Sequence, residues 1–341
     1  MPSIVRSDSF RLGVMKLTTT HLAFTVQAIT PLQLDEFSGA SLRGNFFNAV
    51  WRRFCTNKSS PSCAACPIHD SCPVSALVAP LREESARGQD IPRPYVIIPP
   101  QEGERYYQVG EQFSFGMTLI GSIVELLPYI LLSAAQLEEE GLGRRLDENN
   151  GQRGRFQIVR VECYHPFTQQ RQVIYEKGDL LVQVPIITVL PEDHAARAAT
   201  LNPERITLCF VTPLRLVERE HIVKRARFSP LVQRLLERYL ALEQYYGNQE
   251  LTIEREEKNA WLWLADAIQC REDQTRWQDL KSYSNRQKRA TPIGGLIGTA
   301  TFEGDLTPFL EILVVGELIH VGKNVVKGDG QYRIVKEESH P

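Results

Sequence analysis

Residues 294–332 read GGLIGTATFEGDLTPFLEILVVGELIHVGKNVVKGDGQY, and this order of glycines, apolar residues and lysines indicates the architecture of the second half of the chain. A turn is predicted at Gly294–Gly298, where glycines cluster. A helix should follow, with Thr307 as its N-cap, Pro308 at its first position and Gly316 just after its end. A strand at Gln331–Val335 would then close the unit.

Strands and helices also alternate through the rest of the chain. Apolar residues recur with a period of two in the predicted strands and with helical spacing in the predicted helices. The predicted strands are His21–Ile29, Tyr106–Thr118, Phe156–Tyr164 and Ile206–Val211, and the predicted helices are Ser41–Phe54, Ser122–Glu140 and one that begins after Pro230.

Both halves therefore follow the order strand, helix, strand, strand, helix, strand, which is the ferredoxin-like pattern. We expect an α+β protein with two tandem ferredoxin-like (RRM-like) domains, at residues 1–195 and 204–341. The boundary is placed in residues 191–203, which show no hydrophobic period and end in Asn-Pro. The second domain would carry the Gly-rich loop.

The composition is that of an ordinary globular protein. The 341 residues include 43% hydrophobic and 23% charged residues, which argues against disorder and low complexity. The 39 Lys and Arg residues nearly balance the 41 Asp and Glu residues, so any polyanion site must come from local clustering of charge. The N-terminus has no apolar run, and residues 120–137 contain Glu125 and Pro128. We therefore expect a cytosolic (cytoplasmic) protein with no membrane partner.

Four of the seven cysteines, Cys55, Cys63, Cys66 and Cys72, fall within one short segment. Residues 55–80 form a Cys-rich insertion in the first domain, with no hydrophobic period of its own. Four thiolates suit one structural zinc ion, and such a closed site of four cysteines would leave no open position for a catalytic metal. An iron–sulfur cluster, disulfides or unconnected thiols are the alternatives, and disulfides are disfavoured in the cytosol.

Two segments are locally basic. Lys281–Arg289 has four positive charges and no acid, interleaved with residues that can hydrogen-bond bases or sugars, although a solvated loop is the simpler interpretation. Arg215–Arg238 holds seven Lys or Arg residues against three Glu, and its helical part is expected to be a solubilising outer face.

Glycines among residues 294–330 would let backbone N–H groups approach a phosphate chain, with Lys323 and Lys327 beside them. This ordered string resembles the C-terminal signature of the CRISPR-associated repeat-processing endoribonucleases of the RAMP superfamily. Other segments are similar to the same family in the expected order: Leu42-Arg43-Gly44, the cysteine loop, Gly141-Leu-Gly143, Phe210-x-Thr212-Pro213-Leu-Arg215 and Ser282-x-Ser284-x-Arg286-Gln287.

The resemblance implies two ferredoxin-like domains that bind the repeat of a precursor CRISPR transcript and cut it into guide RNAs. It also implies a metal-independent reaction, in which a ribose 2′-hydroxyl attacks the adjacent phosphorus and leaves a 2′,3′-cyclic phosphate. Many relatives have a histidine near the first helix, but this sequence has neither His nor Tyr between Asp35 and Phe54. CRISPR repeat RNA is the expected partner, and other CRISPR effector-complex or adaptation proteins are further candidates.

The candidate site residues are these. His320 could transfer a proton, and Lys323 could stabilise developing charge, with Arg43 as a further catalytic candidate. Alternatively, His320 and Lys323 only bind the RNA backbone or satisfy local hydrogen bonds. The candidate RNA-binding residues are Arg286, Lys288, Arg289, Gly294, Gly295, Gly322, Lys327, Gly328 and Gly330.

Two other functions remain open from the sequence. One is a non-cleaving CRISPR RNA-binding subunit of an effector complex with the same fold. The other is a zinc-stabilised protein that binds DNA or a protein partner, which the near-zero net charge and the lack of a recognisable DNA-reading helix count against.

Overall fold

The computed structural model describes residues 15–80, 91–247, 253–284 and 289–335. These residues form two compact units, which are described separately. The N-terminal unit comprises the described residues within 19–188, together with 326–328. The C-terminal unit comprises residues 15–18, the described residues within 189–325, and 329–335.

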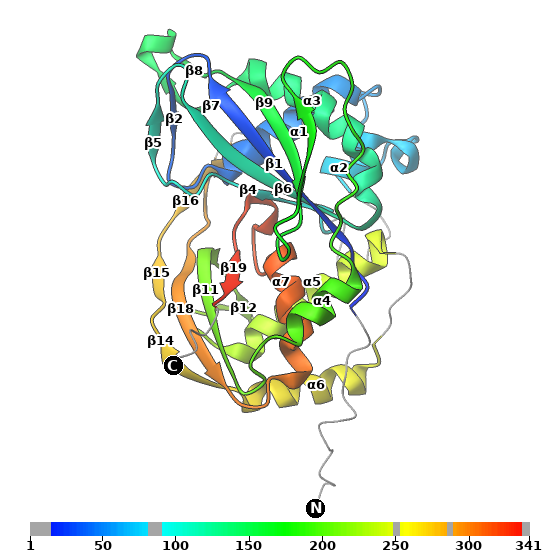
Figure 1. Cartoon of the computed structure of the whole chain (residues 1–341), viewed down its shortest axis with the longest axis vertical. Helices are drawn as coiled ribbons and strands as arrows, with labels where there is room; N and C mark the ends of the chain where they lie inside the picture. The colour runs from blue at the N-terminus through cyan, green and yellow to red at the C-terminus, as the bar shows by residue number, and fades with distance from the viewer. Residues whose placement is uncertain (1–14, 81–90, 248–252, 285–288, 336–341) are drawn as a thin grey trace, which may run out of the picture. The chain divides into compact units, whose positions relative to one another are not determined.

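The N-terminal unit consists of one main antiparallel sheet, short two-stranded sheets and helices (Figure 1). Its elements are β1 (Thr19–Ala28), β2 (Leu32–Leu34), α1 (Gly39–Phe54), η2 (His69–Ser71), α2 (Pro73–Val78), β4 (Tyr95–Ile98), β5 (Arg105–Tyr107), β6 (Gln112–Ile120), η3 (Gly121–Leu126), α3 (Leu127–Glu140), β7 (Leu142–Leu146), η4 (Asp147–Asn149), β8 (Gln152–Gly154), β9 (Phe156–Tyr164) and β10 (Arg171–Glu176).

The main sheet has the strand order β10-β9-β1-β6-β4, so β1 lies between β6 and β9. The alternation predicted for β1 is present, because Leu22, Phe24 and Val26 are buried. Phe24 stacks on Phe115 of β6, with 4.9 Å between ring centroids. Helices α1 and α3 pack against each other (Figure 1). With β10 as an added edge strand, the order of β1, α1, β4, β6, α3 and β9 is ferredoxin-like.

The C-terminal unit repeats this plan around β11 and β18. Its elements are α4 (Pro191–Ala198), β11 (Arg205–Leu214), β12 (Val217–Glu218), β13 (His221–Ile222), α5 (Phe228–Tyr246), α6 (Arg255–Ala267), β14 (Gln269–Asp273), β15 (Arg276–Gln278), β16 (Lys281–Ser284), β17 (Arg289–Pro292), β18 (Gly295–Glu303), η5 (Thr307–Phe309), α7 (Leu310–Ile319) and β19 (Tyr332–Ile334); η6 (Val325–Lys327) precedes β19 and crosses between the two groups of residues.

The sheet of this unit has the order β14-β18-β11-β19, and β15 also pairs with β18. Its two main helices, α5 and α7, pack against each other. The expected α+β architecture of two ferredoxin-like units is therefore confirmed. Within the described part of the chain, the helices are all too short or too polar to cross a membrane.

Four local predictions are wrong. The turn predicted at Gly294–Gly298 is instead mostly strand, because β18 begins at Gly295. Residues 55–80 have some core of their own, because α2 buries Val74, Leu77 and Val78. Residues 191–203 are not featureless, because α4 occupies their first part. The helix predicted to end before Gly316 instead runs through it as α7. Its preceding turn is capped by Asp305, whose Oδ1 accepts a hydrogen bond from the Thr307 N–H at 3.2 Å.

Close packing explains why glycine stands inside α7. A Cβ added to Gly316 would lie 2.1 Å from the Tyr332 hydroxyl and 2.6 Å from the Leu235 Cδ2 atom. The Tyr332 hydroxyl donates a 2.5 Å hydrogen bond to the Leu313 carbonyl oxygen. Glycine at this position thus lets α7 approach β19 and α5, and the packing benefit outweighs the low helix propensity of glycine.

We predict that Gly316→Ala lowers the free energy of unfolding by about 1–3 kcal/mol, because overpacking outweighs the better helix propensity of alanine. Gly44→Ala is the matched control, since Gly44 lies in α1 with nothing within 4 Å of an added Cβ. It should raise the free energy of unfolding by about 0.5–1 kcal/mol. Urea denaturation followed by circular dichroism measures both. Equal stabilisation by the two substitutions would contradict this packing account.

Candidate nucleic-acid interface

Arg215 connects three segments of the C-terminal unit that are far apart in the sequence. Its backbone carbonyl accepts a hydrogen bond from the Lys323 N–H at 3.0 Å. Its Nη1 atom donates to the Gly294 carbonyl oxygen at 3.0 Å. Its guanidinium carbon lies 5.8 Å from the ring centroid of Trp277 in β15. The side chain of Lys323 is exposed, so this arrangement places two cations and an aromatic ring in one region.

Glycines make the approach of these segments possible. Gly322 has a φ of +96°, and a Cβ there would lie 2.6 Å from the Arg215 carbonyl oxygen. Gly330 has a φ of +70°, and a Cβ there would lie 1.8 Å from the Val321 carbonyl oxygen. The loop after α7 can therefore pack against the end of β11 only because both positions lack a side chain.

Gly294 and Gly295 are also required by packing. A Cβ on Gly294 would lie 2.4 Å from the Gln278 carbonyl oxygen, and one on Gly295 would lie 2.6 Å from the Leu214 carbonyl oxygen. Both glycines are buried. Their identity is thus explained by close contact between chain segments, and RNA contact by these two residues remains a prediction.

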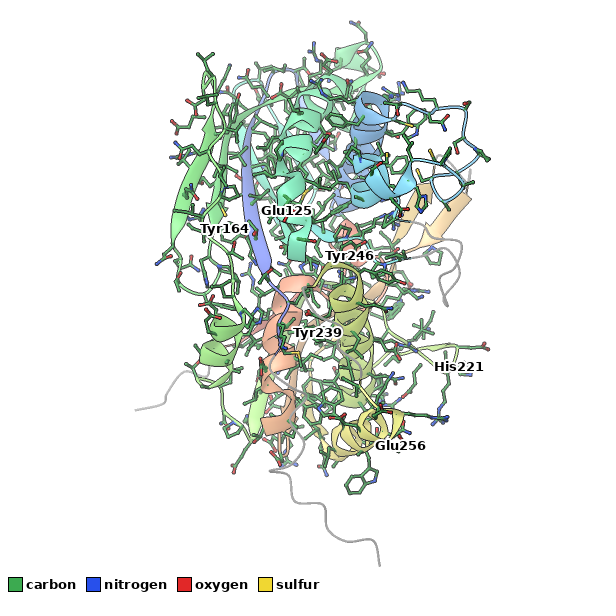
Figure 2. The ribbon with its side chains drawn as sticks, turned by 90° about the vertical axis from the view of Figure 1, so that its right-hand side faces the viewer. Glu125, Tyr164, His221, Tyr239, Tyr246 and Glu256 are labelled. Atoms are coloured by element: carbon green, nitrogen blue, oxygen red, sulfur yellow. The ribbon has the colours of Figure 1, made fainter. Side chains whose placement is uncertain are left out.

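His320 is buried at the end of α7, with 1% of its surface exposed. Its backbone N–H donates to the Gly316 carbonyl oxygen at 3.0 Å, and its φ is +59°. Among the histidines of this unit that the structure describes, His194 is also buried, whereas His221 is exposed on the β12–β13 hairpin (Figure 2). Proton transfer by His320 would therefore require the α7 end to open. His221 is an accessible alternative, and it was not among the residues predicted from the sequence.

Arg238 does not have the solubilising role predicted for its helix face. Its guanidinium is buried, and Nε donates to the carbonyl oxygen of Ile319 at 2.9 Å. Burial lowers the pKa of Arg238 to about 10. The side chain places positive charge beside the last carbonyls of α7, where the helix dipole is negative.

Arg43 lies on α1 in the N-terminal unit. Its guanidinium carbon is 5.5 Å from the ring centroid of Phe47, and its charge acts on the buried phenol of Tyr95. Burial raises the pKa of Tyr95, which opposes ionisation of the phenol, although the charge of Arg43 acts in the opposite direction. These contacts give Arg43 a packing role, and its catalytic role remains a prediction.

The other RNA-binding candidates are distributed over the chain. Arg286 and Lys288 lie outside the described residues. Arg289 begins β17, whose backbone pairs with β16. Lys327 and Gly328 group with the N-terminal unit, where a Cβ on Gly328 would lie 2.7 Å from the Ile97 carbonyl oxygen.

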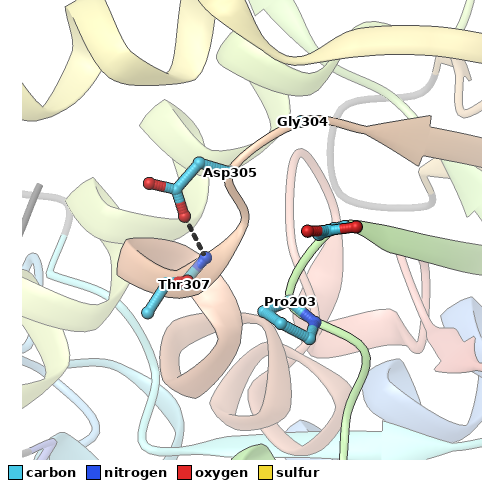
Figure 3. Close-up of a pocket in the computed structure, with 5 residues that line it drawn as sticks. Pro203, Gly304, Asp305 and Thr307 are labelled. Carbon is cyan, nitrogen blue, oxygen red and sulfur yellow. Dashed lines mark hydrogen bonds between the residues drawn. The ribbon is translucent and has the colours of Figure 1, made fainter.

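A separate pocket of the C-terminal unit is acidic. Its volume is about 450 Å³, and Figure 3 shows its position at the start of η5. Its lining residues are Pro203, Glu204, Gly304, Asp305 and Thr307. Two carboxylates and no cation make this pocket a poor site for a phosphate, which favours the Arg215 region for RNA binding.

The cysteine loop brings four free thiols near one another. Cys55 follows α1, the Cys66 N–H donates to the Cys63 carbonyl oxygen at 3.2 Å, and Cys72 precedes α2. Burial raises the pKa of the Cys63 thiol, and the neighbouring thiols Cys72, Cys55 and Cys66 raise it further. Across the described residues, which include all four cysteines, His, Cys, Asp and Glu side chains form no group of three or more that could hold a metal ion. The zinc site thus stays a prediction.

Comparison with protein families identifies the C-terminal unit. Residues 208–332 match the family described as CRISPR-associated endoribonuclease Cas6. This segment of the chain is Cas6-like. Residues 17–186 match a second family, described only as an N-terminal domain. The family resemblance inferred from the sequence is confirmed, and the Arg215 region lies within the matched Cas6 segment.

Solved Cas6 structures share the fold at low sequence identity. A Cas6 product complex has a TM-score of 0.53 at 13% identity, covering 93% of this chain and 99% of that chain. Thermus thermophilus Cas6 has a TM-score of 0.52 at 12% identity, covering 94% and 99%. A chain of a partial Cas6-RT-Cas1–Cas2 complex has a TM-score of 0.56 at 12% identity, covering 96% of this chain and 48% of that chain. This chain therefore spans about half the length of the chain that it matches in that complex. No curated protein sequence matches it.

From the sequence alone, neither Arg215 nor Trp277 is a predicted site residue. For Arg215 the sequence offered one signal of a site role, because this residue ends the Phe210–Arg215 segment that resembles the Cas6 signature. The sequence offered no such signal for Trp277, because its contact with Arg215 depends on the pairing of β15 with β18.

We predict that the purified protein contains about one zinc ion per chain, bound by Cys55, Cys63, Cys66 and Cys72. Cys63→Ser should lose this zinc and fold in lower yield, whereas Cys270→Ser, at an exposed lone cysteine, should retain it. Metal content is measured by mass spectrometry of the native protein. If the wild-type protein contains no metal and is no more stable than Cys63→Ser, the four thiols bind no structural ion.

Proposed function

We propose that this protein binds CRISPR repeat RNA and cuts precursor transcripts into guide RNAs. The observation that carries this proposal is the Cas6 family match over residues 208–332, which contains Arg215, Trp277 and Lys323. The similarity of fold along nearly the full length of a Cas6 product complex supports it. Exposed Lys323 next to Arg215 offers the positive charge that RNA phosphates require.

The proposed reaction is an intramolecular transfer that needs no metal ion. The ribose 2′-oxygen forms a bond with the adjacent phosphorus while the bond from phosphorus to the 5′-oxygen breaks. A base accepts the 2′-hydroxyl proton, and an acid gives a proton to the leaving 5′-oxygen. The products are a 2′,3′-cyclic phosphate and a 5′-hydroxyl, and a nearby cation stabilises the charge on the phosphoryl oxygens.

Lys323 fits the role of that cation because its side chain is exposed while its backbone is fixed by Arg215. Two histidines of the C-terminal unit are alternative candidates for the proton-transfer group. His320 is the candidate predicted from the sequence but is buried, and His221 is exposed. An imidazole suits either role, because its ordinary pKa lies close to neutrality.

A non-cleaving RNA-binding subunit is the second candidate function. The burial of His320 favours it, since a buried imidazole cannot reach a ribose hydroxyl without rearrangement. Association with other CRISPR proteins is also part of the proposal, because one structural neighbour is a chain of a Cas6-RT-Cas1–Cas2 complex.

The purified protein, incubated in EDTA with its own repeat RNA, should make a single cut with a cyclic phosphate on the upstream fragment. Sequencing gels and mass spectrometry of the fragments measure the position and the ends. Repeat RNA with a 2′-deoxy nucleotide at the cut site is the matched control and should stay intact. Bound but uncut RNA would instead support the non-cleaving subunit, and failure to bind the repeat would refute both functions.

Single substitutions assign the proton-transfer group. If His221 is that group, His221→Ala should lower the single-turnover rate by about 10²–10⁴-fold with little loss of affinity. His320→Ala would then affect mainly stability. The opposite result would return the role to His320, and retained cleavage in both variants would exclude both histidines.

A further inference from the structure

Two cations lie over the indole ring of Trp277 in the C-terminal unit. The Arg215 guanidinium carbon and the Lys224 Nζ atom are each 5.8 Å from the ring centroid. Arg215 follows β11, Lys224 follows β13, and Trp277 lies in β15. Three separate segments thus place an aromatic ring and two positive charges together.

The ring and the first cation are held in position. The Trp277 Nε1 atom donates a hydrogen bond to the Asp279 Oδ1 atom at 2.8 Å. On the backbone, Trp277 pairs with Leu296 of β18. Arg215 is fixed by its hydrogen bond to the Gly294 carbonyl oxygen and by the Lys323 N–H that binds its own carbonyl. The arrangement is therefore preorganised, which reduces the entropy lost when a ligand binds.

The positive charges of Arg215 and Lys224 are available to an external anion. Across the described part of the chain, neither Arg215 nor Lys224 lies within ion-pair distance of a carboxylate. Arg227 and Arg234 nearby do pair, with Glu218 and Glu237 respectively. Lys224 is exposed, and Trp277 is half-buried.

We propose that Trp277 is a stacking platform for an unpaired base of the bound RNA, and that Arg215 and Lys224 bind the phosphates beside that base. This inference rests on the proposed RNA-binding function. An aromatic face with adjacent cations matches both parts of a nucleotide, since the base is a flat π-system and the phosphate is an anion. A bare anion would use the cations but not the ring.

Stacking of one base on an aromatic side chain is worth about 1–3 kcal/mol, so Trp277→Ala should weaken repeat binding about 5- to 150-fold. Trp277→Phe should retain most of the affinity, because a π-face remains. Trp263→Ala is the matched control, since Trp263 is 72% exposed on α6 of the same unit and carries no such pair of cations in the described contacts. Fluorescence anisotropy with labelled repeat RNA measures the dissociation constants.

A second binding experiment is decisive. It replaces each unpaired nucleotide of the repeat RNA in turn with an abasic nucleotide. At one position, the loss of the base should weaken binding to the wild-type protein but cause no further loss in Trp277→Ala. If every abasic position costs both proteins equally, the ring stacks on no base and the proposal is refuted. Unchanged affinity in a folded Trp277→Ala variant also refutes it while leaving the proposed function intact. A wild-type protein that does not bind the repeat overturns both.

Discussion

The carbonyl of Arg215 accepts the Lys323 amide hydrogen, while the guanidinium of the same residue binds the Gly294 carbonyl and lies over Trp277. These contacts join the end of β11, the turn before β18 and the loop after α7. Each segment comes from a different part of the ferredoxin-like plan, so their meeting depends on the order of β11 beside β18 and β19. The candidate RNA site is thus a consequence of sheet topology.

The glycines of the Cas6-like signature act mainly within the fold. Gly295 and Gly322 allow two stretches of backbone to approach the 214–215 region more closely than any side chain would permit. Gly316 allows α7 to pack on Tyr332. A direct cradle of backbone amides for phosphate is thus not needed to explain these glycines. Their effect on RNA binding would be indirect, through the placement of Arg215 and Lys323.

The sequence was sufficient to predict the elements with strong hydrophobic periodicity, such as β1 and α1, and the ferredoxin-like order of strands and helices. The sequence-based prediction was wrong where tertiary packing determines the structure. Gly316 was predicted to follow the end of its helix, but it lies inside α7, where it packs against Tyr332. The sequence also could not show that His320 is buried, since that depends on the packing of α7, or that Arg215 meets Trp277. Both outcomes depend on long-range pairing that no local pattern encodes.

The central claim is that the Arg215 region contacts RNA. Ultraviolet crosslinking of the full chain to repeat RNA containing 4-thiouridine, followed by peptide mass spectrometry, tests it directly. The account predicts crosslinked peptides that contain residues 215–224, 276–279 or 321–324. Crosslinks confined to other surfaces, such as residues 203–204 and 304–307 around the acidic pocket, would contradict it.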